Sequence, residues 1–263
     1  MNRVALAMCL VAAGLAGQEN QLTPAEKSAG WKLLFNGRDM TGWDDPRLKN
    51  PPGDAWTIAD GCLKANAHPK LTEDLFTQEK FVDFELVFDW KISSGGNSGV
   101  KYRIQDHVWL HGLAPRFETI VNNSLRDRSS DRPTHGQDYV IGFEYQILDN
   151  QRNPDGRAGL SHTTGALYDM APPDRDASKP VGEFNHSRLV VRGNHVEHWL
   201  NGVKVVDADL STDDVKAHIA KRWSKDSPVY QLLAGQPRKD CPLSLQNHGD
   251  EVWFRNIKIR AIQ

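Results

Sequence analysis

Apolar and polar residues alternate along many short segments of this chain, and this period of two constrains the fold more than any other feature. In 81–92, Phe84, Leu86, Phe88 and Trp90 fall on one side of an extended backbone, and acidic residues occupy most of the other side. Successive side chains of a β-strand point to opposite faces, so the pattern predicts a strand with one buried face. Further segments of strand character are 98–105, 140–148, 188–192, 195–200, 203–207, 229–234 and 251–262.

The turns and helices between these segments favour an all-β fold. Gly193-Asn194 and Asn201-Gly202 are hairpin signals, because both residue types tolerate the positive φ of primed turns, so 188–207 is predicted to be a three-stranded meander. Short helices are predicted only at 23–30 and at 211–223, where Ser211 and Asp214 resemble a capping box. Many strands with few helices favour a sandwich of two sheets or a jelly roll.

The N-terminus has the order of parts of a secretory signal. Arg3 precedes a short apolar run, and Gly14 and Ala16 occupy the small-residue positions of a cleavage site. We therefore expect residues 1–16 to be a signal peptide and the mature protein to be exported to the periplasm, the cell surface or the medium. Residues 17–29 are expected to form a lead-in with a short helix, and 30–263 a single domain.

Composition excludes several classes of protein. The formal net charge of the 263 residues is −2 and there is no basic stripe, which argues against a nucleic-acid binder. No stretch after the signal is apolar enough to span a membrane. Cys62 and Cys241 lie far apart in sequence, so a disulfide and two buried thiols remain equally open.

Three of the predicted strands carry a polar face that is rich in functional groups. If these strands share one sheet, the polar faces form a platform; the alternative is that they simply face water. Lys101 in particular is expected to be solvated. The three polar faces are Lys101, Arg103 and Gln105; Glu144 and Gln146; and Ser244, Gln246 and His248.

Short motifs in a fixed order resemble the 3-keto-disaccharide hydrolase domain family. Each motif is weak alone, but together they span nearly the whole chain after the signal. The resemblance implies a concanavalin A-like jelly roll of two antiparallel sheets that acts on sugars. The motifs are Gly30–Gly37, Thr41–Trp43, Trp56–Gly61, Phe84–Leu86, Asn97–Val100 with Arg103, Glu144–Asp149, Thr164–Tyr168, Glu183–Asn185, His198–Gly202, Leu245–Gly249 and Phe254–Ile257.

The resemblance implies a reaction on glycosides oxidised at C3. A 3-keto group acidifies the C2 proton, so a base can remove it, the C1 substituent leaves, and water then adds. For these roles we expect Glu144 as base, Arg103 as stabiliser of the enolate oxygen, and His248 or His198 as acid. Residues expected to bind the sugar are Asn97, Gln146, Tyr168, Gln246 and Trp109.

Other readings remain open at this stage. A divalent metal ion is an alternative to Arg103 as the electrophile. A glycosidase with two carboxylates would pair Glu144 with Glu183 or Asp149. The chain is alternatively a non-catalytic carbohydrate-binding or adhesion module, because fold alone does not settle function. Three positions that depart from the family pattern, Tyr145, Phe184 and Asn247, are expected to tune the pocket.

Overall fold

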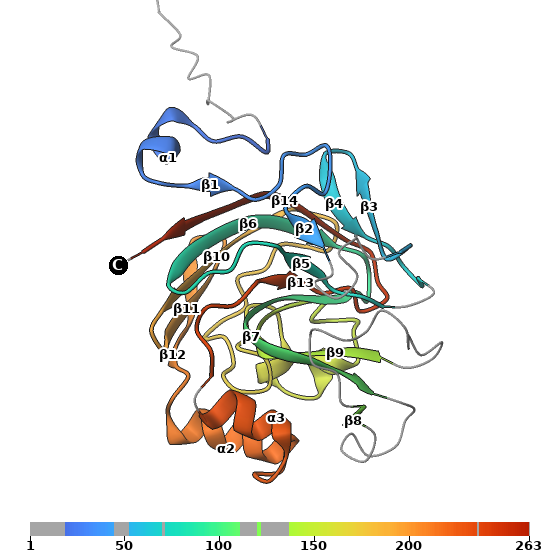
Figure 1. The fold of residues 1–263 in the computed structure, drawn as a ribbon. Coiled ribbons are helices and arrows are strands. Elements are labelled where there is room, and N and C mark those ends of the chain that lie inside the picture. Colours follow the sequence, from blue (N-terminus) through green and yellow to red (C-terminus); the bar gives the residue numbers. More distant parts are fainter. Residues whose placement is uncertain are drawn as a thin grey trace, which may run out of the picture.

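Two packed antiparallel sheets make up most of the protein (Figure 1). The computed structural model describes residues 19–44, 53–69, 72–110, 120–121, 137–235 and 237–262, without the side chains of 107–110, 120–121 and 137–139. The predicted signal peptide and most of the predicted loop 107–137 lie outside the described residues. Within those ranges, none of the helices has both the length and the apolar character that crossing a membrane requires.

The larger sheet has eight strands. Its central strand β6 follows the predicted alternation, with Phe84, Leu86, Phe88 and Trp90 all buried. The final strand β14 lies between β6 and β4 and also pairs with the first strand β1. In spatial order the strands are β12 (Val203–Asp209), β11 (His195–Leu200), β10 (Asn185–Arg192), β6 (Phe84–Ile92), β14 (Val252–Ala261), β4 (Cys62–Ala65) and β3 (Trp56–Ala59), with β1 (Lys32–Leu33) beside β14.

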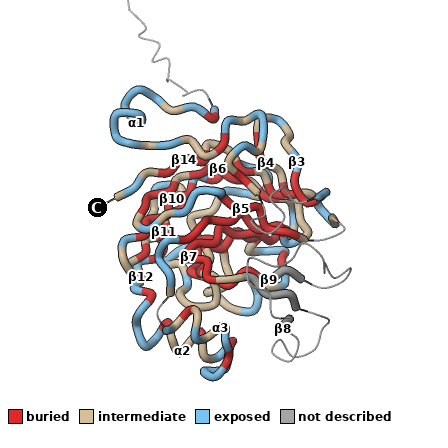
Figure 2. Tube along the Cα trace, in the orientation of Figure 1, coloured by how far each residue is buried: buried red, intermediate tan, exposed pale blue. Residues whose placement is uncertain are grey.

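The smaller sheet has six strands, and the three segments that carry the predicted polar faces are its strands β7, β9 and β13 with the residues that follow β13. Its inner faces contribute Val100, Tyr102, Phe143, Tyr145 and Ile147 to a continuous apolar core between the sheets (Figure 2). The strands are β2 (Trp43–Asp44), β5 (Leu75–Thr77), β13 (Ser244–Leu245), β7 (Asn97–Leu110) and β8 (Ile120–Val121), with β9 (Gln137–Leu148) paired to β7.

The helices are short and confirm most of the predicted positions. In α1 (Pro24–Ser28) the expected N-cap Thr23 forms a capping box. In α2 (Asp213–Arg222) the N-cap is Thr212, because the Ser211 hydroxyl bonds to Asp209 instead. The prediction of a strand at 229–234 was wrong, since this apolar run is too short to distinguish strand from helix by pattern and is helical. The remaining helices are η1 (Asp155–Arg157), η2 (Leu160–His162), α3 (Pro228–Tyr230) and the π-helix η3 (Gln231–Gly235).

The structure confirms the predicted meander and shows the state of the two cysteines. Strands β10, β11 and β12 are antiparallel neighbours joined by two-residue turns, in which Asn201 and Gly202 both have positive φ. Cys62 and Cys241 are buried free thiols and do not form a disulfide with each other.

A buried histidine joins the two sheets through the core. The His198 ring of β11 lies between the Tyr102 hydroxyl and the Gly165 carbonyl oxygen, each 3.0 Å away, and stacks on Tyr145 with 4.7 Å between ring centroids. A carbonyl can only accept, so Nδ1 carries the proton and Nε2 accepts from Tyr102. Burial lowers the pKa of His198 to about 4, so the ring is neutral at physiological pH.

This histidine makes the stability of the fold depend on pH. The unfolded state binds a proton near pH 6.5 and the folded state only near pH 4, so the free energy of unfolding falls as the pH drops between these values. The full loss is about 3 kcal/mol for a shift of this size. We expect urea titrations between pH 7 and 4.5 to show this loss in the wild type and in His195→Gln, whose ring is half-exposed, but not in His198→Gln. Equal pH dependence in all three proteins would contradict the prediction.

Candidate active site

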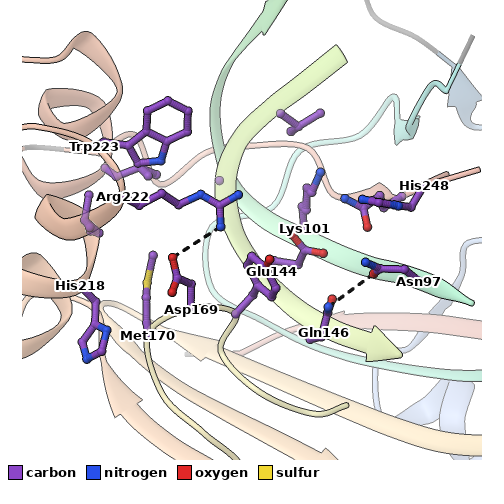
Figure 3. Close-up of a pocket in the computed structure, with 16 residues that line it drawn as sticks. Asn97, Lys101, Glu144, Gln146, Asp169, Met170, His218, Arg222, Trp223 and His248 are labelled. Carbon is purple, nitrogen blue, oxygen red and sulfur yellow. Dashed lines mark hydrogen bonds and ion pairs between the residues drawn. The ribbon is translucent and has the colours of Figure 1, made fainter. Parts of the chain in front are cut away.

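A pocket opens on the face of the smaller sheet that points away from the core (Figure 3). Strands β7 and β9 form its floor, the segment after β13 forms one end, and α2 with the segment 168–170 forms the other. Polar lining residues are Asn97, Lys101, Glu144, Gln146, Tyr168, Asp169, His218, Arg222, Gln246 and His248, and apolar ones include Met170 and Trp223.

Strand register explains why these side chains meet. Lys101 of β7 is opposite both Glu144 of β9 and Ser244 of β13, and Gly99 is opposite Gln146. Directly opposed residues in antiparallel strands point to the same face of the sheet. The prediction that the three polar faces form one platform is therefore confirmed for these positions.

The Glu144 carboxyl occupies the centre of the pocket floor. The Glu144 residue is half-buried, and its carboxyl oxygens accept no hydrogen bond from the residues that the structure describes. Burial raises the pKa of Glu144 to about 7, although the charges of Lys101 and Arg222 act to lower it; Asp74 and Asp155 add to the increase. A carboxyl with this pKa exchanges a proton readily at neutral pH.

Gly99 provides the space in which Glu144 lies. A Cβ atom built on Gly99 would come within 2.7 Å of Cδ and 2.8 Å of Cγ of Glu144. Non-bonded contacts of a Cβ atom are essentially never shorter than about 3 Å, so a side chain here would displace the carboxyl. The absence of a side chain at position 99 thus leaves room for Glu144 in its present position.

Lys101 is buried, and the expectation that it is solvated was wrong. Only 4 % of the residue is exposed, and its Nζ lies 3.1 Å from Oδ2 of Asp74, which precedes β5. The same carboxylate oxygen accepts a hydrogen bond from Oγ of Ser244 at 3.2 Å. The pocket floor therefore holds an ammonium group in a fixed position beside Glu144.

Amide side chains line the end of the pocket near β13. Gln146 and Gln246 are 1 % and 9 % exposed, and in the described part of the chain their Oε1 atoms have no hydrogen-bond partner. Nε2 of Gln146 donates to Oδ1 of Asn97 over 3.4 Å. Buried acceptors without a partner are costly, so a ligand that offers hydroxyl groups would satisfy them.

The other end of the pocket consists of a network in which only Tyr168 was predicted to belong to the site. The backbone N–H of Tyr168 donates to the Glu144 carbonyl, which places its ring beside β9, and its hydroxyl donates to Asp155 at 2.9 Å. Arg222 of α2 stacks over this ring at 5.1 Å and lies 3.5 Å from Asp169. Burial also raises the pKa of Tyr168 above its usual range. The helical spacing predicts Val215, Ile219 and Trp223 on one face of α2 and assigns no role to Arg222.

His248 lies at the rim of the pocket, with its side chain partly exposed. Desolvation and the nearby Lys101 ammonium lower the pKa of His248, so its ring is neutral at neutral pH. A neutral ring still donates one N–H and accepts through its other nitrogen.

Arg103 does not belong to this pocket. It has a positive φ of 51° and lies within the irregular pairing of β7 with β9 between Tyr102 and Asp106, so the alternation of faces breaks at this residue. Its guanidinium is buried elsewhere and donates to the carbonyl oxygens of Lys239 and Gly193 at 2.6 and 2.7 Å, beside Asp83. Arg103 thus fixes a hairpin turn and cannot contact a ligand at Glu144.

Among the other residues considered for the site, His198, Asp149 and Glu183 also lie outside the pocket. His198 is in the core, and the side chain of Trp109 lies outside the described part of the structure. The Asp149 carboxylate accepts backbone hydrogen bonds from a loop, and Glu183 lines a separate cleft, so neither pairs with Glu144.

The three departures from the family pattern do not tune the pocket. Tyr145 is buried in the core, where its hydroxyl contacts Ser187. Phe184 lies under the guanidinium of Arg255 on the larger sheet, and Asn247 bonds to backbone carbonyls.

In the part of this pocket that the structure describes, no three His, Cys, Asp or Glu side chains bring their ligand atoms within 4.8 Å of one another. Among the described residues, the group of three donors with ligand atoms within 4.8 Å of one another is His195, Glu197 and Asp207, on β11 and β12 of the other sheet. Lys204 and Trp199 already bond to these carboxylates.

Comparison with known proteins connects this geometry to sugar chemistry. Residues 30–260 match the family described as the 3-keto-alpha-glucoside-1,2-lyase-like domain. A 3-keto-disaccharide hydrolase of Bacteroides thetaiotaomicron is 32 % identical over 246 residues, covering 89 % of this chain and 79 % of the relative.

Solved structures agree with the fold. A "putative glycosyl hydrolase" from Parabacteroides distasonis is 28 % identical, with a TM-score of 0.69 over 94 % of this chain and 100 % of that one. A second structure with this description from the same organism is 24 % identical, with a TM-score of 0.56 over 88 % and 99 % of the two chains, and supports the fold alone.

The contact between Gly99 and Glu144 is testable without a substrate. In Gly99→Ala the new methyl group should push the carboxyl toward water, so the pKa of Glu144 should fall from about 7 toward the ordinary value for glutamate. We expect ¹³C NMR titration of the labelled carboxyl to show this decrease. Gly53→Ala is the control, because its Cβ would meet only an ordinary contact at 3.9 Å. An unchanged titration in Gly99→Ala would contradict the assigned geometry.

Proposed function

The chain belongs to the family of 3-keto-alpha-glucoside-1,2-lyase-like domains and is a carbohydrate-active enzyme, and from this premise we propose that it cleaves 3-keto-glycosides. The reaction that we propose is abstraction of the C2 proton, elimination of the C1 substituent and hydration of the product. The observation that carries the proposal is Glu144, a carboxyl with a pKa near 7 in a pocket lined by amides.

In the proposed first step, the Glu144 carboxylate takes the C2 proton. The electrons of the C2–H bond form a C2–C3 double bond, and the carbonyl electrons move to the oxygen at C3. The enolate then collapses: its electrons form the C1–C2 double bond, the C3 carbonyl is restored, and the C1–O bond breaks. The leaving oxygen takes a proton, for which His248 at the rim is the proposed donor.

In the hydration step, Glu144 would act as a proton donor instead of a base. The oxygen of a water molecule bonds to C1 of the unsaturated sugar, the proton that this water releases returns to the His248 nitrogen that protonated the leaving group, and the protonated Glu144 returns a proton to C2. The sum is a 3-keto-glycoside plus water giving a 3-keto sugar and an alcohol. A pKa of about 7 suits a group that must both accept and return a proton at neutral pH.

The amide end of the pocket supports binding of a sugar ring. The oxygens of Gln146 and Gln246 can accept from sugar hydroxyls, and Asn97 and Tyr168 lie on the same lining. Sites built to pair buried polar groups with hydroxyls discriminate strongly against ligands that lack them.

We also propose that the enzyme is exported. The support is the sequence of residues 1–16, with a basic start, an apolar run and small residues at the cleavage positions.

The role of Glu144 is testable with a matched glutamate. Glu144→Gln should lower kcat/KM on a 3-keto-glucoside by about 10³-fold, because general-base catalysis is worth about 10²–10⁴-fold. Glu183→Gln should stay within about 2-fold of the wild type, since its side chain lines a different cleft. The unoxidised glucoside should not be cleaved by any of the three proteins, as its C2 proton is not acidic.

Two outcomes would contradict this assignment. Near-normal turnover by folded Glu144→Gln would exclude Glu144 as the base. Binding of the sugar by the wild type without any turnover would favour a carbohydrate-binding module instead.

The pH profile provides an independent test. The base must be deprotonated, and its pKa is raised, so kcat/KM should increase with pH up to about 7 and then level off. The charged groups that set this value are Lys101 on β7, Asp74 before β5, Arg222 on α2 and Asp155 in η1. A profile that is already flat from pH 5 upward would show that the group which acts as base has an ordinary carboxyl pKa.

A further inference from the structure

We propose that Lys101 is a catalytic residue whose ammonium group stabilises the enolate oxygen at C3, and that Asp74 is the positioning residue that holds it. This inference rests on the proposed function, because it assigns the electrophile of that reaction. It replaces Arg103, which the irregular pairing of β7 carries away from the pocket.

The position of Lys101 suits this role. Its Cα is opposite that of Glu144 across β7 and β9, so both side chains rise from the same face of the sheet. Figure 3 shows the two side chains between the amide end of the pocket and the residues of α2. In a sugar whose C2 lies over Glu144, the C3 oxygen is two bonds from C2 and can face the same floor of the pocket.

Asp74 keeps the ammonium charged and fixed before the substrate arrives. The ion pair spans 3.1 Å, both side chains are buried, and Ser244 holds the carboxylate by a further hydrogen bond. A donor that is already oriented pays no reorganisation cost when charge develops in the transition state. Since the carboxylate holds the nitrogen as an ammonium, the interaction that we propose is a charged hydrogen bond rather than a covalent imine.

An ion pair with a purely structural role would not affect the chemistry of the substrate. The test therefore isolates enolate formation with 3-keto-1,5-anhydroglucitol, a sugar that has no leaving group at C1. Exchange of its C2 proton in D₂O, followed by ¹H NMR, reports proton abstraction alone. Turnover of a 3-keto-glucoside is measured in parallel, together with the kinetic isotope effect of C2 deuteration.

The proposed role of Lys101 predicts the behaviour of each variant in these assays. Lys101→Met should lower both the exchange rate and kcat/KM by about 10²–10³-fold, the usual effect of removing one donor to an oxyanion. The isotope effect should rise as proton removal becomes rate-limiting. Lys101→Arg should keep part of the activity, because it keeps the charge. Lys32→Met, which breaks an exposed ion pair with Glu79, should behave as the wild type.

A second set of variants tests the role of Asp74 and controls for the folding of Lys101→Met. Lys101→Met leaves the Asp74 charge buried without its partner, which can itself prevent folding. The double variant Lys101→Met/Asp74→Asn removes this charge and should be folded and equally slow. Asp74→Asn alone should lower kcat by about 10-fold with little change in KM, because the ammonium remains but is less well held.

The outcomes separate the two proposals. If the wild type neither exchanges nor cleaves any 3-keto sugar, both proposals fail. If the wild type is active and a folded Lys101→Met variant exchanges the C2 proton within about 3-fold of it, only the role of Lys101 is overturned. Trapping of the sugar on Lys101 with cyanoborohydride, detected by mass spectrometry, would also overturn it by showing an imine.

Discussion

The antiparallel pairing of β7 with β9 is the constraint on which the pocket depends. Its register places Lys101 opposite Glu144 and leaves Gly99, which has no side chain, beneath the carboxyl. A shift of one residue would turn every side chain of one strand to the other face. The core fixes this register. On the inner face of β7 and β9, away from the pocket, Tyr102 and Tyr145 are fully buried, and their hydroxyls bond to groups of the larger sheet. Packing between the sheets thus determines the chemistry on the outer face.

Much of this arrangement was predictable from the period of two. The alternation around Glu144 and Gln146, and around Gln246 and His248, correctly placed these residues on one polar face, and the hairpin signals correctly gave the meander. The same rule could have excluded His198, because it shares a strand face with Val196 and Leu200, which are both buried. The motif resemblance points to His198 as a site residue, but the alternation of β11 places it in the core.

The remaining errors have causes that alternation cannot reveal. Arg103 adopts a left-handed backbone, and nothing in its neighbours marks the interruption of the strand. Lys101 appeared to be a solvated residue because its partner Asp74 is 27 positions away in sequence and on another strand connection. Arg222 reaches the pocket only through the packing of α2 against the segment after η2. Long-range contacts of this kind depend on tertiary structure rather than on local pattern.

The balance of charges at Glu144 links burial to the proposed chemistry. Desolvation alone would keep the carboxyl protonated, and an isolated lysine beside it would keep it ionised and a weak base. Desolvation is the largest influence, and Asp74 opposes the field of Lys101 while leaving the ammonium in place, so the pKa of Glu144 is about 7, between these extremes. When a proton moves to Glu144, negative charge appears on the substrate, and the same ammonium then faces an anion instead of a neutral ketone. A paired lysine therefore interacts more strongly with the enolate than with the bound substrate, and only such a difference lowers the barrier.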